Sequence, residues 1–152
     1  MILMKDVFLR KATSEDVMLI FEWANDKEVR QNSFNSSSIP LEEHMGWYEK
    51  KMHSETTLFY IMMDKEQPVG QIRLELDGDC AQVNYSVAAD HRGKGYGKEM
   101  LHLAELELQK AYPDILKMVA EVKADNQASQ GAFEKEGYRK SYLVYEKEIA
   151  NE

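Results

Sequence analysis

Apolar residues with a helical period dominate the first third of the chain. A short run at 7–12 predicts a first strand. Behind a Thr-Ser cap, the segment 13–26 then carries apolar residues on one helical face: Val17, Ile20, Phe21 and Ala24. The segment 27–34 is expected to form a second short helix, and Pro40 suits the first turn of a third helix over 41–52.

The pattern changes to strands in the middle of the chain. β-Branched and aromatic residues fill 56–64, and apolar and polar residues alternate over 69–77. A Gly-Asp turn then leads into a third run at 80–89. Because the turns between these runs are short, the three segments predict an antiparallel meander.

Helix and strand patterns alternate in the last third. A helix over 97–112, stopped by a proline, precedes an expected strand at 116–124. The segment 126–137 predicts a helix ended by a glycine, and 138–149 predicts a last strand. We therefore expect one α+β domain over residues 1–152, with helices flanking a mixed, mostly antiparallel sheet.

Composition narrows the class of protein. The chain has 152 residues, 43% hydrophobic and 30% charged, which is ordinary for a globular domain long enough to bury a core. Its apolar runs are far shorter than a membrane span, and its apolar opening lacks the basic flank and cleavage site of a secretory signal. We therefore expect a cytoplasmic protein with no membrane contact.

Charge and metal-binding residue types exclude further classes. A net charge of −8 disfavours nucleic acid as a partner, because phosphate backbones require a basic face, but it permits a small anionic ligand in a local positive pocket. Cys80 is the sole cysteine and the four histidines show no ligand spacing, so we expect no metal and no internal disulfide. Cys80 itself is expected to be a small buried residue.

Residues 90–100 combine glycine and positive charge directly ahead of an expected helix. Three of the chain's eight glycines fall within five positions, among cationic residues: Gly93, Gly95, Gly97, Arg92, Lys94 and Lys98. A helix N-terminus offers free N–H groups and the positive end of a dipole, and glycine lets an anion approach them closely. The segment therefore predicts a phosphate site.

Three phosphate-binding patterns compete for this segment. Gly93-Lys94 is not followed by Ser or Thr as in a P-loop, and G-x-G-x-G spacing after antiparallel strands does not fit the dinucleotide fingerprint. The remaining match is R-x-x-G-x-G, at Arg92, Gly95 and Gly97. A glycine-rich turn with incidental lysines is the plain alternative.

The R-x-x-G-x-G segment resembles the loop of the GNAT acyl-CoA N-acetyltransferases, whose amides hold the pyrophosphate of coenzyme A. A second segment resembles a later signature of that family: Asn126, Ser129, Phe133, Gly137 and Tyr138. The order of the expected elements agrees as well, so the resemblance covers nearly the whole chain. It implies the GNAT fold and acetyl transfer from acetyl-CoA to a primary amine.

The resemblance also implies site residues. The implied coenzyme A contacts are Val87, Ala88, Arg92, Gly93, Lys94, Gly95, Gly97, Lys98, Asn126 and Phe133. It implies direct attack by the amine without an acyl-enzyme, a backbone N–H near Val87 as oxyanion donor, and chemical roles for Asn126 and Ser129. The family's usual proton donor to the thiolate is a tyrosine at the position of Phe133, so Ser129 is the expected substitute and Tyr138 a weaker one.

The general base is expected to be a carboxylate acting through water. Glu75, on the strand before the central one, is the candidate, and an exposed strand glutamate is its plain alternative. Rival groups lie on the third expected helix: Glu42, Glu43 and His44. An aminosugar nitrogen needs little help, since deprotonating an α-amino-like group at pH 7 costs about 1.4 kcal/mol.

The N-terminal third bears on the acceptor. It resembles a GNAT branch that acetylates the 4-amino group of nucleotide-linked 4-amino-4,6-dideoxysugars for surface glycans such as pseudaminic acid, or for spore-coat polysaccharide. The matching residues are Trp23, Asn25, Asp26, Val29, Arg30, Phe34, Glu42, Glu43, His44 and Trp47. Arg30 would grip a diphosphate, Trp47 or Phe34 would stack on a base or sugar, and His44 would bind a sugar hydroxyl. Packing roles are the plain alternatives.

Other functions stay open at this point. Related enzymes acetylate protein N-termini, polyamines or antibiotics, and a non-catalytic acetyl-CoA-binding module is the alternative outside enzymes. The sequence leaves both a monomer and a homodimer open.

Overall fold

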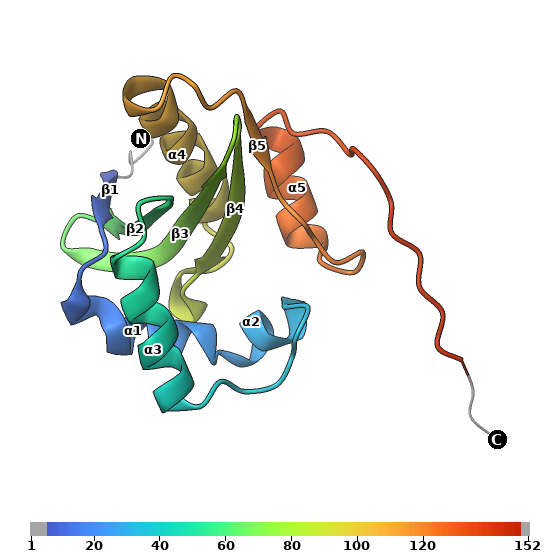
Figure 1. Ribbon diagram of the computed structural model, residues 1–152, viewed down its shortest axis with the longest axis horizontal. Helices are drawn as coiled ribbons and strands as arrows, with labels where there is room; N and C mark the ends of the chain where they lie inside the picture. The colour runs from blue at the N-terminus through green and yellow to red at the C-terminus, as the bar shows by residue number, and fades with distance from the viewer. Residues whose placement is uncertain (1–5, 150–152) are drawn as a thin grey trace.

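The computed structural model describes residues 6–149, which form strands and helices in the predicted order (Figure 1). The strands are β1 (Val7–Lys11), β2 (Thr57–Asp64), β3 (Gln67–Asp77), β4 (Cys80–Val87) and β5 (Lys117–Val119). The helices are α1 (Val17–Ala24), α2 (Lys27–Asn32), α3 (Leu41–Met52), α4 (Tyr96–Ala111) and α5 (Gln127–Lys135).

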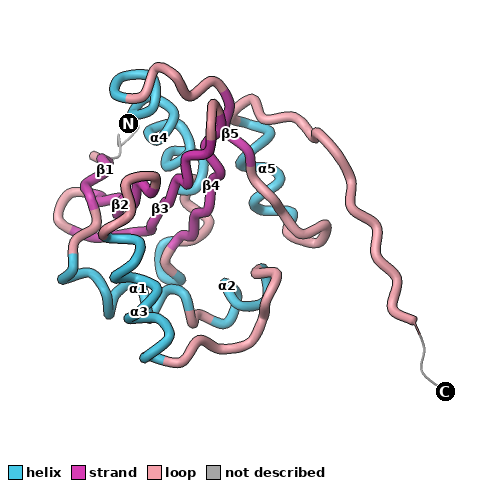
Figure 2. Tube along the Cα trace, viewed as in Figure 1, coloured by secondary structure: helices cyan, strands magenta, loops and turns pink. Residues whose placement is uncertain are grey.

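The strands form one sheet in the order β1-β2-β3-β4-β5 (Figure 2). β1 to β4 are antiparallel neighbours, which confirms the predicted meander, and β5 joins β4 in parallel. The expected α+β architecture with a mixed, mostly antiparallel sheet is therefore confirmed. Gly78 makes the β3–β4 turn with φ of +61°, a conformation that favours glycine.

Two apolar cores cover opposite faces of the sheet. On one face, Met100 of α4 and Leu74 of β3 are fully buried in the same cluster. On the other face, Ile20 of α1 and Tyr48 of α3 share a cluster with Ile61 of β2. The sheet is thus held between α4 and α5 on one side and α1 and α3 on the other.

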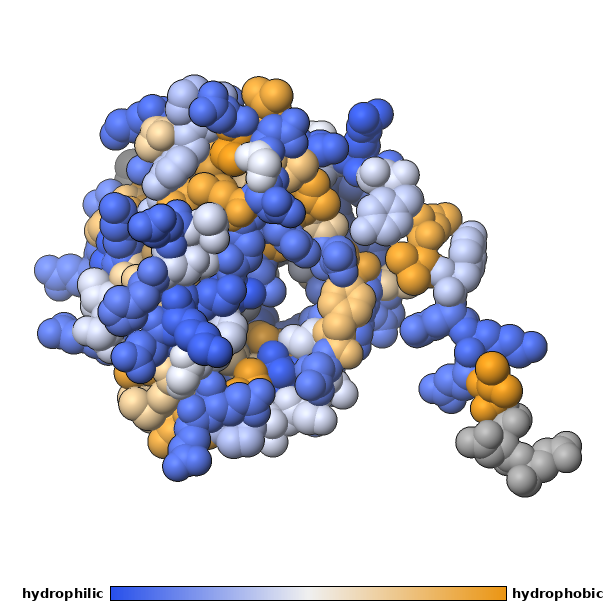
Figure 3. Space-filling model, viewed as in Figure 1, coloured by the Kyte–Doolittle hydropathy of each residue, from blue (hydrophilic) through white to orange (hydrophobic). Residues whose placement is uncertain are grey.

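Two elements near the C-terminus differ from expectation. β5 holds only Lys117–Val119 of the expected strand at 116–124. The strand predicted at 138–149 is wrong, because this segment runs away from the body (Figures 1 and 3), with Leu143 69% and Tyr145 88% exposed. An alternating pattern becomes a strand only where a neighbour receives its backbone hydrogen bonds, and the short β5 offers none to this segment.

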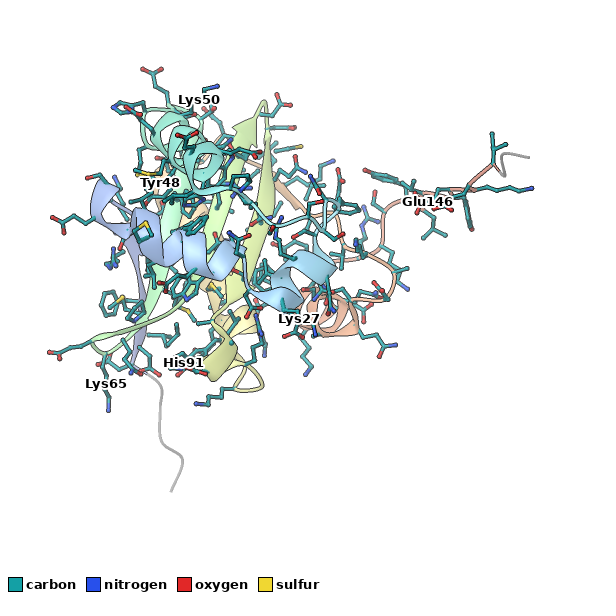
Figure 4. The ribbon with its side chains drawn as sticks, turned by 90° about the horizontal axis from the view of Figure 1, so that it is seen from below. Lys27, Tyr48, Lys50, Lys65, His91 and Glu146 are labelled. Carbon is teal, nitrogen blue, oxygen red and sulfur yellow. The ribbon has the colours of Figure 1, made fainter. Side chains whose placement is uncertain are left out.

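A partly buried ion pair fixes the start of α1 against the sheet. Asp16 is 7% exposed, and its carboxylate accepts two hydrogen bonds of 2.8 Å from the guanidinium of Arg10 on β1. It accepts another of 2.8 Å from the N–H of Thr13, whose carbonyl accepts from the hydroxyl of Tyr48 at 2.6 Å. Figure 4 labels Tyr48, which comes from α3. The pKa of Asp16 is lowered, and the hydrogen bond from Arg10 is the largest cause.

We expect the Arg10–Asp16 pair to make the free energy of unfolding depend on pH in the acidic range. Because the pKa of Asp16 is lower in the folded than in the unfolded chain, the pair stabilises the fold above about pH 3.9 and is lost as pH falls through the folded value. Asp16→Asn should lower the free energy of unfolding at neutral pH by about 1–3 kcal/mol and flatten its decline in acid.

Urea unfolding across the acidic range measures both quantities. The matched control is Glu15→Gln, since Glu15 is an exposed acid one residue away. If Asp16→Asn and the parent protein lost stability in acid to the same extent, the ion pair would have no such role.

Candidate functional site

The main cavity opens where β5 leaves β4. The two strands pair only over Cys80–Gln82 and Lys117–Val119, and β4 continues alone on that side to Val87. A cavity of about 930 Å³ lies at this divergence, and Figure 3 shows the face of the molecule hollowed there. Within residues 6–149 no strand covers this edge of β4, so its backbone groups are open to an extended ligand.

Both parts of the predicted site meet at this cavity. Its lining contains the expected catalytic residue Ser129. It also contains most of the expected coenzyme A contacts and all the expected acceptor contacts: Val87, Arg92, Gly93, Gly95, Gly97, Lys98, Asn126, Phe133, Arg30, Phe34, His44 and Trp47. Ala88, Lys94 and Glu75 lie outside the lining. The N–H of Ala88 donates to the Val69 carbonyl at 2.8 Å, so its amide is already satisfied within the sheet.

The glycine segment forms the turn that starts α4. Gly93 and Gly95 have φ of +77° and +82°, in the left-handed region that residues with a Cβ rarely adopt. Gly95 is the N-cap of α4 and provides no side-chain cap, so the first turn of the helix, which includes Gly97 and Lys98, can direct N–H groups at a ligand. With Lys98 in the first turn, these groups form a setting that favours an anion.

Arg92 does not stand free beside the turn as expected. Its guanidinium forms ion pairs of 2.6 Å with Asp26 and 2.7 Å with Glu28. Asp26 is also the N-cap of α2, where it accepts from the N–H groups of Glu28 and Val29. Arg92 therefore ties the glycine turn to the start of α2, and these two acids offset its positive charge.

Tyr85 of β4, which sequence reasoning missed, stands beside α5. Its hydroxyl donates to Ser129 Oγ at 3.0 Å, and its ring meets Phe133 edge-on with 5.6 Å between centroids. Gly97 leaves room for this ring, because a Cβ there would lie 3.0 Å from Tyr85 Cε2. Asn126 caps α5 by accepting from the N–H of Ser129 at 3.2 Å. Burial raises the pKa of Tyr85, so it keeps its hydroxyl hydrogen at neutral pH.

Arg73 of β3, a second missed residue, forms the cavity wall on the opposite face of the sheet. Its guanidinium lies 4.9 Å from the ring centre of Trp47 and 5.8 Å from that of Phe59. Its Nε donates to Glu75 at 3.0 Å, and within the described residues its two Nη atoms have no hydrogen-bond partner. Burial lowers the pKa of Arg73 but leaves it cationic at neutral pH. This wall combines an aromatic surface with a positive charge.

Strand alternation carried the signal for both missed residues. Tyr85 and Val87 share the face of β4 that meets α5, and Arg73 shares the opposite face of the sheet with Gln71 and Glu75. A charged residue that alternation places inside is uncommon, and it marks either a buried pair or a ligand site.

Arg30 is engaged by the protein itself, contrary to the expectation that it grips a diphosphate. Its Nε donates to the Ala24 carbonyl at 2.7 Å, and its two Nη atoms donate to oxygens of the loop at 33–37 over 3.1–3.2 Å. An irregular loop needs donors for its carbonyl groups, and Arg30 supplies them. Its role is to shape the loop that carries Phe34 at the cavity.

His44 packs inside the fold, which differs from the expectations that it binds a sugar hydroxyl or acts as a rival general base. It is 2% exposed, its Nε2 lies 2.9 Å from the Val17 carbonyl, and its ring stacks on Tyr48. A ring nitrogen so engaged is not available to a sugar hydroxyl or an amine proton. Trp47 and the 69%-exposed Phe34 line the cavity.

Glu75 is held away from the cavity as a structural carboxylate, which corrects its assignment as the general base. It forms ion pairs of 2.8 Å with Lys51 and 3.0 Å with Arg73, and it accepts a hydrogen bond of 2.7 Å from Thr57. Although burial opposes the shift, these contacts lower the pKa of Glu75. A carboxylate stabilised in this way is a poor proton acceptor.

The remaining candidates divide between the cavity and the rest of the fold. Glu43 lines the cavity and Glu42 does not. Tyr138 is outside the lining, and its hydroxyl donates to Met118 Sδ at 3.3 Å, so it is not placed to act on a ligand there. Cys80 is half-buried, not buried as expected, because it begins β4 near the end of the sheet.

The described part of the chain provides neither a metal cluster nor a membrane-spanning helix. Over residues 6–149, no three or more histidine, cysteine, aspartate or glutamate side chains gather in a way that could hold a metal ion. In the same range, every helix is too short or too polar to cross a membrane. The apolar opening at residues 1–4, which we interpreted as no secretory signal, lies outside the described residues.

Comparison with known proteins gives a family and a fold. Residues 6–139 match the family model of the acetyltransferase (GNAT) domain. A search of curated protein sequences gives no significant match.

Solved structures with the same fold include enzymes with different acceptors. A spermidine N-acetyltransferase from Vibrio cholerae, in complex with CoA and spermine, has a TM-score of 0.81 at 20% identity, over 95% of this chain and 88% of that chain. The aminoglycoside acetyltransferase AAC(6')-Ib in complex with coenzyme A has a TM-score of 0.77 at 21% identity, over 91% of this chain and 87% of that chain. RimL, a ribosomal L7/L12 alpha-N-protein acetyltransferase in complex with coenzyme A, has a TM-score of 0.75 at 16% identity, over 86% of this chain and 78% of that chain. At these identities the likeness shows the shared fold alone.

Gly95→Ala should weaken binding of coenzyme A. A Cβ at a φ of +82° is strained, and it would stand among the helix N–H groups that a phosphate approaches. We expect the Kd for coenzyme A, measured by calorimetry, to rise at least about tenfold. The matched control is Gly78→Ala, where φ is +61° and open space surrounds the added methyl group. Equal Kd values for the two variants would contradict a phosphate site at this turn.

Proposed function

Because this chain belongs to the GNAT acetyltransferase family, we propose that it acetylates the amine of an acceptor that also carries negative charge, namely a nucleotide-linked 4-amino-4,6-dideoxysugar. The family makes the chain an acetyl-CoA-dependent N-acetyltransferase, with acetyl-CoA as cosubstrate. The observation that carries the choice of acceptor is the Arg73 guanidinium, with its two open Nη atoms, beside Trp47.

Acetyl-CoA would lie along the open edge of β4. The N–H groups at the start of α4 would hold its diphosphate, with positive charge from Lys98. Its pantetheine arm carries amides, which suit the backbone groups of β4 that β5 leaves uncovered beyond Gln82. Asn126 and Phe133 would border the arm on the α5 side.

The reaction would proceed by direct attack. The acceptor nitrogen attacks the thioester carbon, an N–H near Val87 stabilises the oxyanion, and sulfur leaves with the electron pair of the C–S bond. Ser129 would donate a hydrogen bond to that sulfur, since Phe133 has no hydroxyl to offer. With Glu75 held in ion pairs, water accepts the amine proton, which costs about 1.4 kcal/mol for an α-amino-like nitrogen at pH 7.

The charge of the cavity supports an anionic acceptor over a polyamine. On a chain of net charge −8, five cationic and three acidic side chains line this cavity: Arg30, Arg73, Arg92, Lys98 and Lys135, with Glu28, Glu43 and Glu121. Because Asp26 and Glu28 offset Arg92, the remaining balance is four cationic against two acidic side chains. A polyamine requires acidic partners, whereas Arg73 beside Trp47 favours a phosphate. Trp47 and the exposed Phe34 offer ring faces to a base or a sugar.

Acetyl transfer to a panel of amines tests this proposal. The panel holds UDP-linked 4-amino-4,6-dideoxysugars, a peptide N-terminus, spermidine and an aminoglycoside, and release of the coenzyme A thiol is measured. We expect the highest kcat/KM for a nucleotide aminosugar. A preference for another amine would assign the function to that amine, and binding of acetyl-CoA with no turnover on any acceptor would favour a non-catalytic module.

Substitution of Arg73 should separate the two substrates. Arg73→Gln removes the charge and the planar fork, and we expect the acceptor KM to rise about 10- to 150-fold, with the acetyl-CoA KM within about twofold. Arg73→Lys keeps the charge and should have a smaller effect. The matched control is Lys51→Met, which removes the other cation beside Glu75 outside the cavity lining. An equal rise in both KM values would assign Arg73 to the fold.

A further inference from the structure

A phenol hydroxyl lies next to Ser129 although the usual tyrosine position is Phe133. The phenol belongs to Tyr85, which enters from β4 and reaches across to α5 with a hydrogen bond of 3.0 Å to Ser129 Oγ. The ring is fixed on two sides, because Phe133 meets it at an interplanar angle of 80° and Gly97 of α4 leaves it room. Tyr85 thus connects the start of α4, where a diphosphate would bind, with the serine of α5.

The hydrogen bond determines where the hydrogen of Ser129 can point. A serine hydroxyl has one hydrogen and two lone pairs, and Tyr85 donates into one of those lone pairs. With Tyr85 as the donor in this pair, the Ser129 hydroxyl forms no hydrogen bond to any other protein acceptor within residues 6–149. Since Ser129 lines the cavity, that hydrogen is available to a ligand there.

We propose that Tyr85 is a positioning residue for acetyl transfer, which holds the Ser129 hydroxyl so that its hydrogen faces the sulfur of acetyl-CoA. The inference rests on the proposed function, in which Ser129 donates to that sulfur. Hydrogen-bonded hydroxyls polarise each other, so the bond from Tyr85 makes Ser129 a stronger donor as negative charge develops on sulfur.

The proton balance leaves both hydroxyls intact. The nitrogen lone pair forms the C–N bond, the C–S bond breaks, and sulfur keeps its electron pair. The ammonium form of the amine gives one proton to water before the attack, and the nitrogen gives a second to water as the amide forms. The thiolate, whose thiol has a pKa of about 8.5, takes one proton from water, so one proton is released overall. Tyr85 and Ser129 only donate hydrogen bonds, which agrees with the raised pKa of the buried Tyr85.

Steady-state kinetics of hydroxyl-deletion variants test the proposal in the full-length protein. Tyr85→Phe keeps the ring against Phe133 and should lower kcat about three- to tenfold, with the acetyl-CoA KM within about twofold. Ser129→Ala should lower kcat about 10- to 100-fold. The double variant should match Ser129→Ala, because Tyr85 acts only through Ser129. Ser129→Thr retains a hydroxyl and should keep most of the rate.

The matched control is Tyr60→Phe, which removes a buried phenol hydroxyl from the same apolar core outside the cavity lining and should leave kcat unchanged. If Tyr85→Phe kept the parent kcat while Ser129→Ala lowered it, the role of Tyr85 would be overturned. The same holds if the double variant lost kcat by the product of the two single losses. A lower melting temperature of Tyr85→Phe together with a higher KM for acetyl-CoA would also overturn that role, because it would show that the hydroxyl supports the fold. A full rate in Ser129→Ala would remove both hydroxyls from the mechanism and leave the acceptor assignment, which the amine panel tests, unaffected.

Discussion

The short pairing of β5 with β4 is the constraint on which the rest of the structure depends. Hydrogen bonds over Cys80–Gln82 and Lys117–Val119 anchor the two parallel strands at one end, and beyond them the strands diverge. The remaining edge of β4 is left with backbone groups to satisfy, and an open edge is a liability unless something covers it. A cavity of about 930 Å³ lies along this edge, so a ligand with amide groups can complete the sheet.

β4 serves both walls of the cavity because its side chains alternate. Tyr85 faces α5, whereas Asn84 and Ser86 accept hydrogen bonds from the buried Gln71 on the face that carries Arg73. Tyr85, the proposed positioning residue, and the Arg73 wall proposed to receive the acceptor therefore lie on the same paired strands. A direct transfer requires two aligned substrates, and neighbouring strands of one sheet are suited to hold them in a fixed relation.

Local pattern predicted the fold, and long-range contacts decided the site. The meander, the helices and the glycine turn follow from periodicity and backbone freedom, which neighbouring residues set. Arg30, His44 and Glu75 have side chains suited to a site, but loop carbonyls, a helix carbonyl and two cations engage them, and sequence does not show such partners. The prediction of a strand at 138–149 failed for the same reason, because a strand needs a neighbouring strand to pair with as well as an alternating pattern.

A crystal structure with coenzyme A tests most directly the claim that the divergence of β4 and β5 forms the cosubstrate site. We predict diphosphate oxygens within hydrogen-bonding distance of the N–H groups at 93–97, the pantetheine arm along the open edge of β4, and the sulfur within reach of Ser129 Oγ. Coenzyme A bound elsewhere, or with its sulfur on the face of the sheet away from Ser129, would contradict the account.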